Sequence, residues 1–285
     1  MISKQTLIVG TYNVQNMFTR ADIRHGMKIP VKSRTSLNAL AENIRQADAD
    51  IVALQECTSR QTLSDFLENH NLSENYPHIA HVSGNDFRGV NVAVISKYPF
   101  TEVTSHKDVR FPLVDGSGEG KFSRDFLRVD VDINGNNEAD FTLYTAHSRS
   151  RLPVGSVKAE VKRISEAKAM REIAESEMKR YPQRLFVITG DLNDGSQDTS
   201  LQTLLKPSSE QEEWVDSLAD KPREEQITWP SYRSKYNDYP AEQLDHIIFP
   251  KSAQKQLANS KVNCYNNNAS DHFLLTSEFY LYQRE

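Results

Sequence analysis

A short stretch near the middle of the chain, residues 185–194, constrains the fold most strongly. It begins with Leu-Phe-Val-Ile-Thr, an apolar run without alternation that is typical of a strand buried on both faces. Gly190 ends the run because it adopts backbone angles that a side chain resists. Asp191 and Asn193 therefore lie at a strand exit, where active sites are commonly built. Because Gly, Asp and Asn are also ordinary turn residues, this segment alone leaves both a plain turn and a functional site open.

Two halves of the chain each combine strands with one or two helices. Apolar and β-branched runs predict strands at residues 6–12, 51–55, 78–82, 90–95, 100–104, 126–133, 140–146, 243–249 and 273–282. Helical spacing of apolar residues predicts helices at 35–48, 61–69, 155–180 and 198–205. Helices that cover one face of each of two sheets predict an α/β (α+β) fold, a four-layer αββα sandwich of two packed mixed β-sheets with helices on the outer faces. No linker or repeat interrupts the pattern, so we expect a single domain over residues 1–285.

Composition excludes several classes of protein. The 285 residues carry a net charge of −5, which argues against a generally basic, nucleic-acid-coating protein but allows a locally basic groove. Two cysteines are too few for a disulfide framework, and Cys57 is expected to be buried. The short, polar N-terminus does not match a secretory signal and no stretch suits a membrane span, so we expect a cytoplasmic protein without stable membrane association. Residues 208–226 carry seven acids and are expected to be a solvated excursion.

Polar side chains follow predicted strands at five places, and a further acid interrupts an apolar strand. Each alone has an alternative interpretation as a turn, a cap or a satisfied buried group. Carboxylate and amide oxygens suit Mg²⁺, and a histidine nearby offers a donor to a developing negative charge. Their combination therefore favours a phosphate-directed metal site. The residues are Asn13, Glu56, His147, Asp191 with Asn193, Asp271 with His272, and Asp245.

These motifs resemble those of the endonuclease/exonuclease/phosphatase superfamily, in the same order and over essentially the whole chain. The resemblance implies a DNase I-like four-layer sandwich with the site at the top of the two sheets, which agrees with the layer argument above. The motifs are Thr11-Tyr12-Asn13-Val14-Gln15-Asn16-Met17-Phe18, Leu54-Gln55-Glu56, Thr145-Ala146-His147, Gly190-Asp191-Leu192-Asn193, Leu244-Asp245-His246-Ile247 and Ser270-Asp271-His272.

The resemblance implies a role for each residue that matches a family motif. Glu56 matches the principal Mg²⁺ ligand, with Asn13 beside it and Asp271 close to the metal. Mn²⁺ is expected to substitute for Mg²⁺. Asp191 matches the group that orients or deprotonates the attacking water, and Asn193 matches the amide that holds the phosphate.

Three further residues take roles around the phosphate. His272 matches the histidine that donates to the phosphoryl oxygen, and Asp245 matches the carboxylate that orients it. His147 matches the histidine that contacts the scissile phosphate in members that have Thr-x-His at this position.

The sequence departs from the family pattern at two places. Gln15 stands where several members carry an acid, which puts a second metal ligand in doubt although an amide oxygen can still coordinate. After His147, arginines replace the lysines of a Phe-Lys-Ser-Lys run, and arginine grips phosphate bidentately. Arg149 and Arg151 are therefore candidate phosphate ligands, with a solvated loop as the alternative. Arg124 resembles a family arginine near the site.

The resulting functional hypothesis is a divalent-metal-dependent phosphodiesterase, a nuclease that hydrolyses DNA by attack of a water activated by Asp191. Basic stretches at residues 20–34 and 149–163 favour a nucleic-acid substrate. Trp229, Tyr232 and Tyr236 are candidates for stacking on bases, with packing as the alternative. The other hypotheses are a phosphatase or phosphodiesterase for inositol phosphates or phospholipid head groups, and an inactive binding module. No protein partner can be inferred.

Overall fold

A computed structural model describes residues 2–19, 22, 30–151, 158–206, 212–230, 240–265 and 268–284, and two six-stranded mixed sheets pack face to face at its centre. The first sheet has the order β13-β14-β1-β2-β4-β3: β13 (Leu257–Asn263), β14 (Leu274–Arg284), β1 (Ile2–Met17), β2 (Ile51–Cys57), β4 (Asn91–Ser96) and β3 (His78–His81). The second has the order β11-β12-β10-β9-β8-β5: β11 (Trp214–Asp216), β12 (Asp245–Pro250), β10 (Leu185–Asp191), β9 (Phe141–His147), β8 (Phe126–Val131) and β5 (Phe100–Thr104). A small hairpin, β6 (Phe111–Pro112) with β7 (Glu119–Gly120), stands apart.

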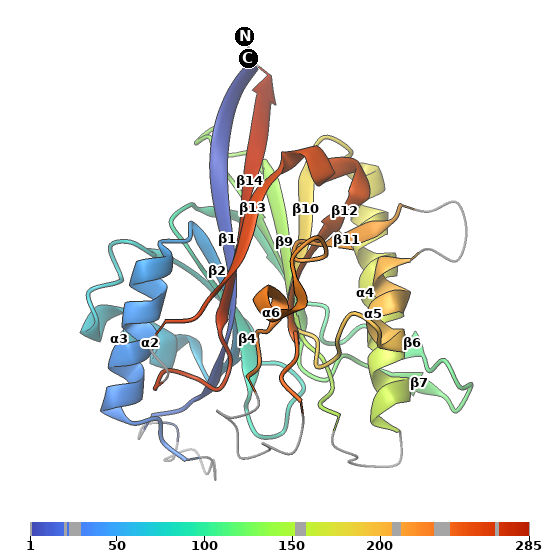
Figure 1. The fold of residues 1–285 in the computed structure, drawn as a ribbon, viewed down its shortest axis with the longest axis horizontal. Coiled ribbons are helices and arrows are strands. Elements are labelled where there is room, and N and C mark those ends of the chain that lie inside the picture. Colours follow the sequence, from blue (N-terminus) through green and yellow to red (C-terminus); the bar gives the residue numbers. More distant parts are fainter. Residues whose placement is uncertain are drawn as a thin grey trace.

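Helices cover the outer face of each sheet, so the predicted four-layer sandwich is confirmed (Figure 1). Figure 1 shows α2 and α3 on one flank, α4 and α5 on the other, and both termini at the same end of the sandwich. The helices are α2 (Arg34–Ala47), α3 (Arg60–Asn69), α4 (Ala159–Arg180), α5 (Thr199–Leu205), the short α6 (Arg223–Gln226) and the 3-10 helix η2 (Lys251–Gln256). The start of the predicted helix at 155–180 lies partly outside the described residues.

Alternate side chains of the central strands enter different cores. In β2, Ile51 and Ala53 pack between the sheets, whereas Val52 and Leu54 pack against α2 and α3. In β10, Val187 faces the other sheet, whereas Phe186 and Ile188 pack under α4 and α5. Both faces of these strands are therefore buried, which is the physical reason why their sequences are apolar without alternation.

Local signals set where the first two helices begin. Ser33 caps α2 by accepting a hydrogen bond from the Ser36 amide at 3.1 Å, and Ser59 caps α3 by accepting one from the Thr62 amide at 3.1 Å. Each cap satisfies an amide that the first turn leaves without a helical partner.

The solvated excursion expected at residues 208–226 is contradicted only for residues 212–218; residues 219–226 are mostly exposed, and residues 208–211 lie outside the described residues. Trp214 is buried under α4 and α5, and its strand β11 pairs with β12 along the edge of the second sheet. Leu218 is also buried, between the sheets. The acids alternate with apolar residues that reach the core, so local charge was a poor guide to burial here. The edge strand β13, which is half exposed, was missed for lack of an apolar run.

Candidate active site

Three site residues meet at one edge of the second sheet because of how its strands pair. β9 and β10 run parallel and place His147 in register with Asp191 at their carboxyl ends. β12 runs antiparallel to β10, so its first residue, Asp245, pairs with Asp191 at the same edge. Side chains that are 44 to 98 residues apart in the sequence are brought together in this way. The register follows from the buried faces described above.

The first sheet delivers its polar residues to the same end of the sandwich. β1 and β2 are parallel and pair Asn13 with Gln55, the residue before Glu56. β14 runs antiparallel to β1, and His272 stands just before it. Gln55 is buried and donates to Thr145 Oγ1 at 3.2 Å, which joins the two sheets directly beneath the site.

Irregular backbone at these strand ends aims the side chains. The pairing of β1 with β2 shifts register after Asn13, and Gln15, Asn16 and Glu56 all have positive φ, at 48°, 52° and 67°. In a regular strand Glu56 would point away from its neighbour Gln55, towards the helix layer. The bulge instead turns it into the pocket. Such strained positions in non-glycine residues are concentrated at functional sites.

Gly190 lets the ends of β9 and β10 approach each other. Its φ is +136°, and a Cβ at this position would lie 1.9 Å from the carbonyl oxygen of Ala146. No side chain fits there. The glycine is required by this close approach as well as by the turn.

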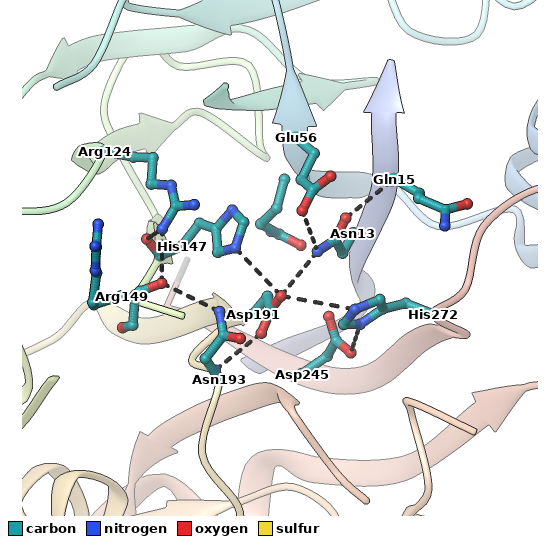
Figure 2. A network of polar contacts seen from close by, with 12 residues as sticks. Asn13, Gln15, Glu56, Arg124, His147, Arg149, Asp191, Asn193, Asp245 and His272 are labelled. Carbon is teal, nitrogen blue, oxygen red and sulfur yellow. Dashed lines mark hydrogen bonds and ion pairs between the residues drawn. The ribbon is translucent and has the colours of Figure 1, made fainter. Parts of the chain in front are cut away.

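Asp191 is the centre of a hydrogen-bond network (Figure 2). Its Oδ2 accepts from Asn13 Nδ2 at 2.8 Å and lies 3.4 Å from His147 Nε2 and 3.8 Å from His272 Nε2. Its Oδ1 accepts the backbone amide of Asn193 at 2.9 Å. Burial raises the pKa of Asp191 to about 6, with the Asp245 charge adding to the rise and His272 opposing it. The carboxylate is thus tuned towards proton acceptance near neutral pH.

His272 and Asp245 form a buried ion pair beside Asp191. His272 Nδ1 lies 2.7 Å from Asp245 Oδ2, and Asp245 is completely buried. Burial opposes the charge of His272, but the carboxylates of Asp245 and Asp191 outweigh it and raise the pKa to about 10. His272 is therefore an imidazolium at neutral pH, with both nitrogens protonated. Ser270 fixes the loop because its Oγ donates to Asn13 O at 2.7 Å and accepts from the His272 amide at 3.1 Å.

His147 has the opposite electrostatic character. It is fully buried, and burial together with the positive charges of Arg124 and His272 lowers its pKa well below the usual value. The ring is neutral, and its Nδ1 has no hydrogen-bond partner among the described residues. Two histidines on either side of Asp191 thus differ in charge because only His272 has a carboxylate on its far nitrogen.

Glu56, Asn13 and Asp271 line the pocket and offer oxygen ligands of the kind that Mg²⁺ prefers. Glu56 Oε2 accepts the Asn16 amide at 2.7 Å, and Oε1 lies 3.4 Å from Asn13 Nδ2. Among the described residues, no lysine or arginine forms an ion pair with Glu56. A carboxylate that is directed into a pocket and bonded to no described cation fits a metal ligand, although the charges of Lys32 and Arg88 do act on Glu56.

Gln15 fits the predicted role less well. Its backbone amide donates to Asn13 Oδ1 at 3.0 Å, but Figure 2 shows its side-chain amide directed away from Glu56 and Asn13. Lys32 lies nearby and donates to the Gln15 carbonyl at 3.2 Å. Burial lowers the pKa of Lys32 to about 8, although Asp271 and Glu56 counteract this. In this geometry the cationic neighbour and the outward amide argue against Gln15 as a ligand.

A second group has the dimensions of a metal site. Potential ligand atoms of Asp191, Asp245 and His272 lie within 4.8 Å of one another. A protonated His272 cannot ligate a metal through either nitrogen, and one of its nitrogens is already bonded to Asp245. On physical grounds the Glu56 group is the better candidate for the ion at neutral pH.

The three candidate phosphate-binding arginines have different environments. Arg124 is buried, donates to the Ser148 carbonyl at 2.9 Å and lies 3.2 Å from an oxygen of Asp86. Asn193 Nδ2 donates to the same carbonyl at 3.2 Å. Arg149 is half-buried, and its backbone amide donates to Glu166 at 3.0 Å. Arg124 lines the pocket, whereas Arg149 does not.

Arg151 is held by acids of the chain itself. Its Nε lies 3.3 Å from Asp194 and donates to the Asn193 carbonyl at 2.8 Å, its Nη2 lies 3.0 Å from Asp198, and its Nη1 lies 2.7 Å from Glu242. All three nitrogens therefore have protein partners. This arrangement favours a structural role for Arg151 at the pocket rim, and its role as a phosphate ligand stays a prediction.

One pocket of about 500 Å³ contains most of the predicted residues. Those that line it are Asn13, Gln15, Glu56, Arg124, His147, Arg151, Asp191, Asn193, Asp271 and His272. Asp245 lies behind His272. Trp229 also lines the pocket, whereas Tyr232 and Tyr236 lie outside the described residues. A hollow of about 540 Å³ near Tyr181 and Tyr282 contains none of the predicted residues.

Two further charged residues lie at this pocket: Arg88, which was not a candidate from the sequence, and Lys32, which belongs to the basic stretch at residues 20–34 but was not assigned to the site. Arg88 lines it, and Lys32 lies beside Gln15. Neither belongs to a recognisable motif, because both come from loops whose course is set by other contacts. An acid two residues before Arg88 was the available signal, and such a pair is common in solvated turns.

Comparison with known proteins agrees with this geometry. A model of the endonuclease/exonuclease/phosphatase family matches residues 9–264. The chain belongs to this family. The family assignment made from the motifs is confirmed, and members of the family hydrolyse phosphoester bonds. No curated protein matches the sequence at a significant level.

Several solved structures share the family fold. Truncated TDP2 of Caenorhabditis elegans is 14% identical, with a TM-score of 0.61 over 96% of this chain and 98% of that one. Beta toxin 275–280 of Staphylococcus aureus is 19% identical, with a TM-score of 0.66 over 95% and 99% of the two chains. The catalytic domain of human nocturnin is 12% identical, with a TM-score of 0.65 over 99% and 97%. At these identities the likeness establishes the fold.

In the described part of the chain, no helix combines the length and the apolar composition needed to cross a bilayer.

Proposed function

We propose that this family member is a divalent-metal-dependent phosphodiesterase, a nuclease that hydrolyses DNA phosphodiester bonds by in-line attack of water on phosphorus. One observation carries the proposal. Asp191, with a pKa raised to about 6, lies between the neutral His147 and the charged His272 in one pocket with Glu56. A base, a cationic donor and a hard-metal ligand are the groups that such a hydrolysis needs.

Asp191 orients the water and accepts its proton. Asn13 holds the carboxylate through the 2.8 Å hydrogen bond to Oδ2, and the Asn193 amide holds Oδ1. Both oxygens are thus fixed by protein donors. This fixation defines the direction in which the base presents its free lone pairs.

His272 donates to a nonbridging phosphoryl oxygen through Nε2. Asp245 keeps the ring charged and fixes its orientation through Nδ1. Because the site is buried, this charge is worth more against a developing negative charge than it would be in water. Asn193 and the neutral His147 complete the contacts to the phosphate, with Arg124 behind them.

Glu56, with Asn13 and Asp271, would hold Mg²⁺, and Mn²⁺ is expected to substitute because it accepts the same oxygen ligands. When bound, the ion neutralises charge on the phosphoryl oxygens. Human nocturnin was solved with a bound sulfate anion, a tetrahedral analogue of phosphate, which supports a phosphate site on this fold.

A direct assay tests the proposal. Purified protein with Mg²⁺ or Mn²⁺ is given plasmid, single-stranded and duplex DNA, RNA and soluble inositol phosphates. We expect cleavage of DNA that is lost in Asp191→Asn and in His272→Ala. Glu56→Gln should raise the Mg²⁺ concentration needed for half-maximal rate and should abolish the metal-induced rise in Tm. Glu138→Gln, an exposed acid outside the pocket, is the matched control.

The outcomes separate the alternatives. Nicking that survives both Asp191→Asn and His272→Ala would contradict the mechanism. Turnover of inositol phosphates alone would replace the nuclease by a small-phosphoester phosphatase. Binding of DNA without cleavage in the wild type would favour an inactive binding module.

A further inference from the structure

The turn between β3 and β4, residues 86–89, contributes Arg88 to the lining of the pocket. The Asp86 carbonyl accepts the Gly89 amide at 2.9 Å, and Asp86 Oδ1 accepts the Arg88 amide at 2.8 Å. These two bonds make the turn a defined element rather than an open loop. Arg88 lines the pocket, and none of the motifs quoted above includes this segment.

Asp86 holds two arginines at once. It receives Arg88 Nε at 3.0 Å and Nη2 at 2.9 Å, and Arg124 Nε lies 3.2 Å from it on the other side. Burial favours the neutral acid, but the two arginines outweigh it and lower the pKa of Asp86. The two cations share one anion, so the group as a whole keeps a net positive charge.

Arg88 remains available to a ligand. Its side chain is 42% exposed, and its Nη1 has no hydrogen-bond partner among the described residues. It lines the same pocket as Glu56 and His147. A guanidinium held at one edge and open at the other is suited to a phosphate oxygen.

Phe87 lies between the two charged residues of the turn and is 92% exposed, the highest value among the exposed large apolar residues of the described chain. An isolated exposed apolar residue is common on protein surfaces. Here the ring belongs to the residue directly before a cation that lines the pocket. An aromatic face beside an arginine is the arrangement that binds one nucleotide of a single strand, base on ring and phosphate on guanidinium.

We propose that Phe87 and Arg88 form a binding position for the nucleotide next to the scissile phosphate, so that the substrate is a polynucleotide with an unpaired base at that place. This inference rests on the proposed nuclease function and specifies its substrate class. One ring buries too little apolar area to anchor the protein on a lipid surface, where two signals are usually needed. The adjoining Arg88 and Arg124 favour a polyanion.

The experiment compares a single-stranded dodecamer, dT12, with the dinucleotide dTpdT. Phe87→Ala and Arg88→Gln are assayed against both with Mg²⁺. We expect Phe87→Ala to lower kcat/KM on dT12 by about 5- to 100-fold, the range that loss of one stacked base gives. The loss on dTpdT should be several-fold smaller because the dinucleotide has fewer places at which to engage the turn.

Binding gives a readout that does not depend on turnover. In an Asp191→Asn background, affinity for fluorescent dT12 is measured against salt concentration. Arg88→Gln should reduce the slope of log affinity against log salt by about 0.7, the value for one phosphate contact on a single strand. Tyr282→Ala and Arg45→Gln are the matched controls. Tyr282 is 53% exposed and pairs with Lys4, about 30 Å along β1 from Asn13, and Arg45 is an exposed residue of α2.

The results distinguish two failures. Wild-type protein that cleaves no DNA at all, plasmid and duplex included, would overturn the proposed function, whereas cleavage of duplex DNA with neither dT12 nor dTpdT cleaved would overturn this inference alone. Cleavage of dT12 that is equal in wild type, Phe87→Ala and Arg88→Gln, with an unchanged salt slope, would overturn this inference alone. Loss of binding to phosphatidylserine-containing vesicles in Phe87→Ala, with unchanged action on dT12, would assign the ring to a membrane surface and would likewise overturn it.

Discussion

Asn13 Nδ2 donates to Asp191 Oδ2 at 2.8 Å, and this hydrogen bond joins the end of β1 in one sheet to the end of β10 in the other. The two residues are 178 positions apart. The amide orientation is fixed by a second bond, because Asn13 Oδ1 accepts the Gln15 amide at 3.0 Å. A single side chain thus links Asp191 to the part of the pocket that contains Glu56.

Removing this donor should weaken the base. We expect Asn13→Ala to lower kcat by about 10- to 100-fold, the range for losing one hydrogen bond to a charged group. It should also raise the pKa of Asp191, since the bond favours the ionised form. Asn13→Asp should raise that pKa further by placing a second carboxylate beside it. The rate as a function of pH measures both effects, and an Asn13→Asp variant with the wild-type pH profile would contradict the coupling.

The acidic side of the pH profile of kcat/KM, its acid limb, should reflect the ionisation of Asp191. Its carboxylate accepts a proton only when ionised, so kcat/KM should fall about tenfold per pH unit below a pKa of about 6. His272, with a pKa of about 10, stays charged across the range from pH 6 to 9. In His272→Gln, the acid limb of the remaining activity should move to higher pH, because the positive charge of His272 no longer favours the ionised form of Asp191. A limb that stays in place would show that another group sets it.

Arg151 should act on the shape of the pocket rim more than on substrate charge. It ties the turn after Asn193 to Glu242, near the start of β12. We expect Arg151→Ala to lower the free energy of unfolding by about 1–2 kcal/mol, between the values for exposed and buried ion pairs. Arg151→Lys should recover part of it, since an ammonium cannot span all the acids. Urea denaturation measures the change.

Salt dependence separates this role from direct phosphate binding. Because Asp194, Asp198 and Glu242 already neutralise Arg151, its removal should leave the salt slope of DNA binding unchanged, in contrast to Arg88→Gln. A reduced slope in Arg151→Ala would restore it as a phosphate ligand.

A second buried pair, His246 with Asp216, should make stability depend on pH. His246 Nδ1 lies 2.5 Å from Asp216, and Nε2 donates to the Asp194 carbonyl at 2.9 Å. Burial opposes the charge, but Asp216 prevails and raises the pKa of His246. The stability from this pair is therefore fully present below the unfolded-state pKa of about 6.5 and is lost as pH rises through the higher folded-state value.

Asp216→Asn tests this linkage. It should cost about 3–5 kcal/mol at pH 6, as expected when one partner of a buried pair is removed. Between pH 6 and pH 9 the free energy of unfolding of Asp216→Asn should also fall much less than that of the wild type. Denaturation curves at both pH values measure this, with Glu138→Gln as the control. Parallel curves for wild type and Asp216→Asn would mean that His246 is neutral in the folded protein.

The sequence by itself determined the layers, and it named most of the predicted residues that the structure brings together in one pocket. Strands such as β2 and β10 are buried on both faces, so their apolar runs lack alternation and can be recognised locally. The ends of these runs are marked by polar residues, and their order identified the family. The helix starts were also local, because Ser33 and Ser59 cap α2 and α3 within one turn.

Only the tertiary structure decided which groups act together and with what charge. Which histidine is charged depends on a carboxylate that reaches His272 and not His147, and that contact crosses 27 residues. From the sequence, Arg151 was expected to contact phosphate or to lie in a solvated loop. In the structure, Asp194, Asp198 and Glu242 from two loops form ion pairs with it. Arg88 enters the pocket because Asp86 holds it there. The pattern of apolar residues in a sequence indicates which strands are buried. Charge state and side-chain direction instead depend on neighbours that folding brings from elsewhere in the chain.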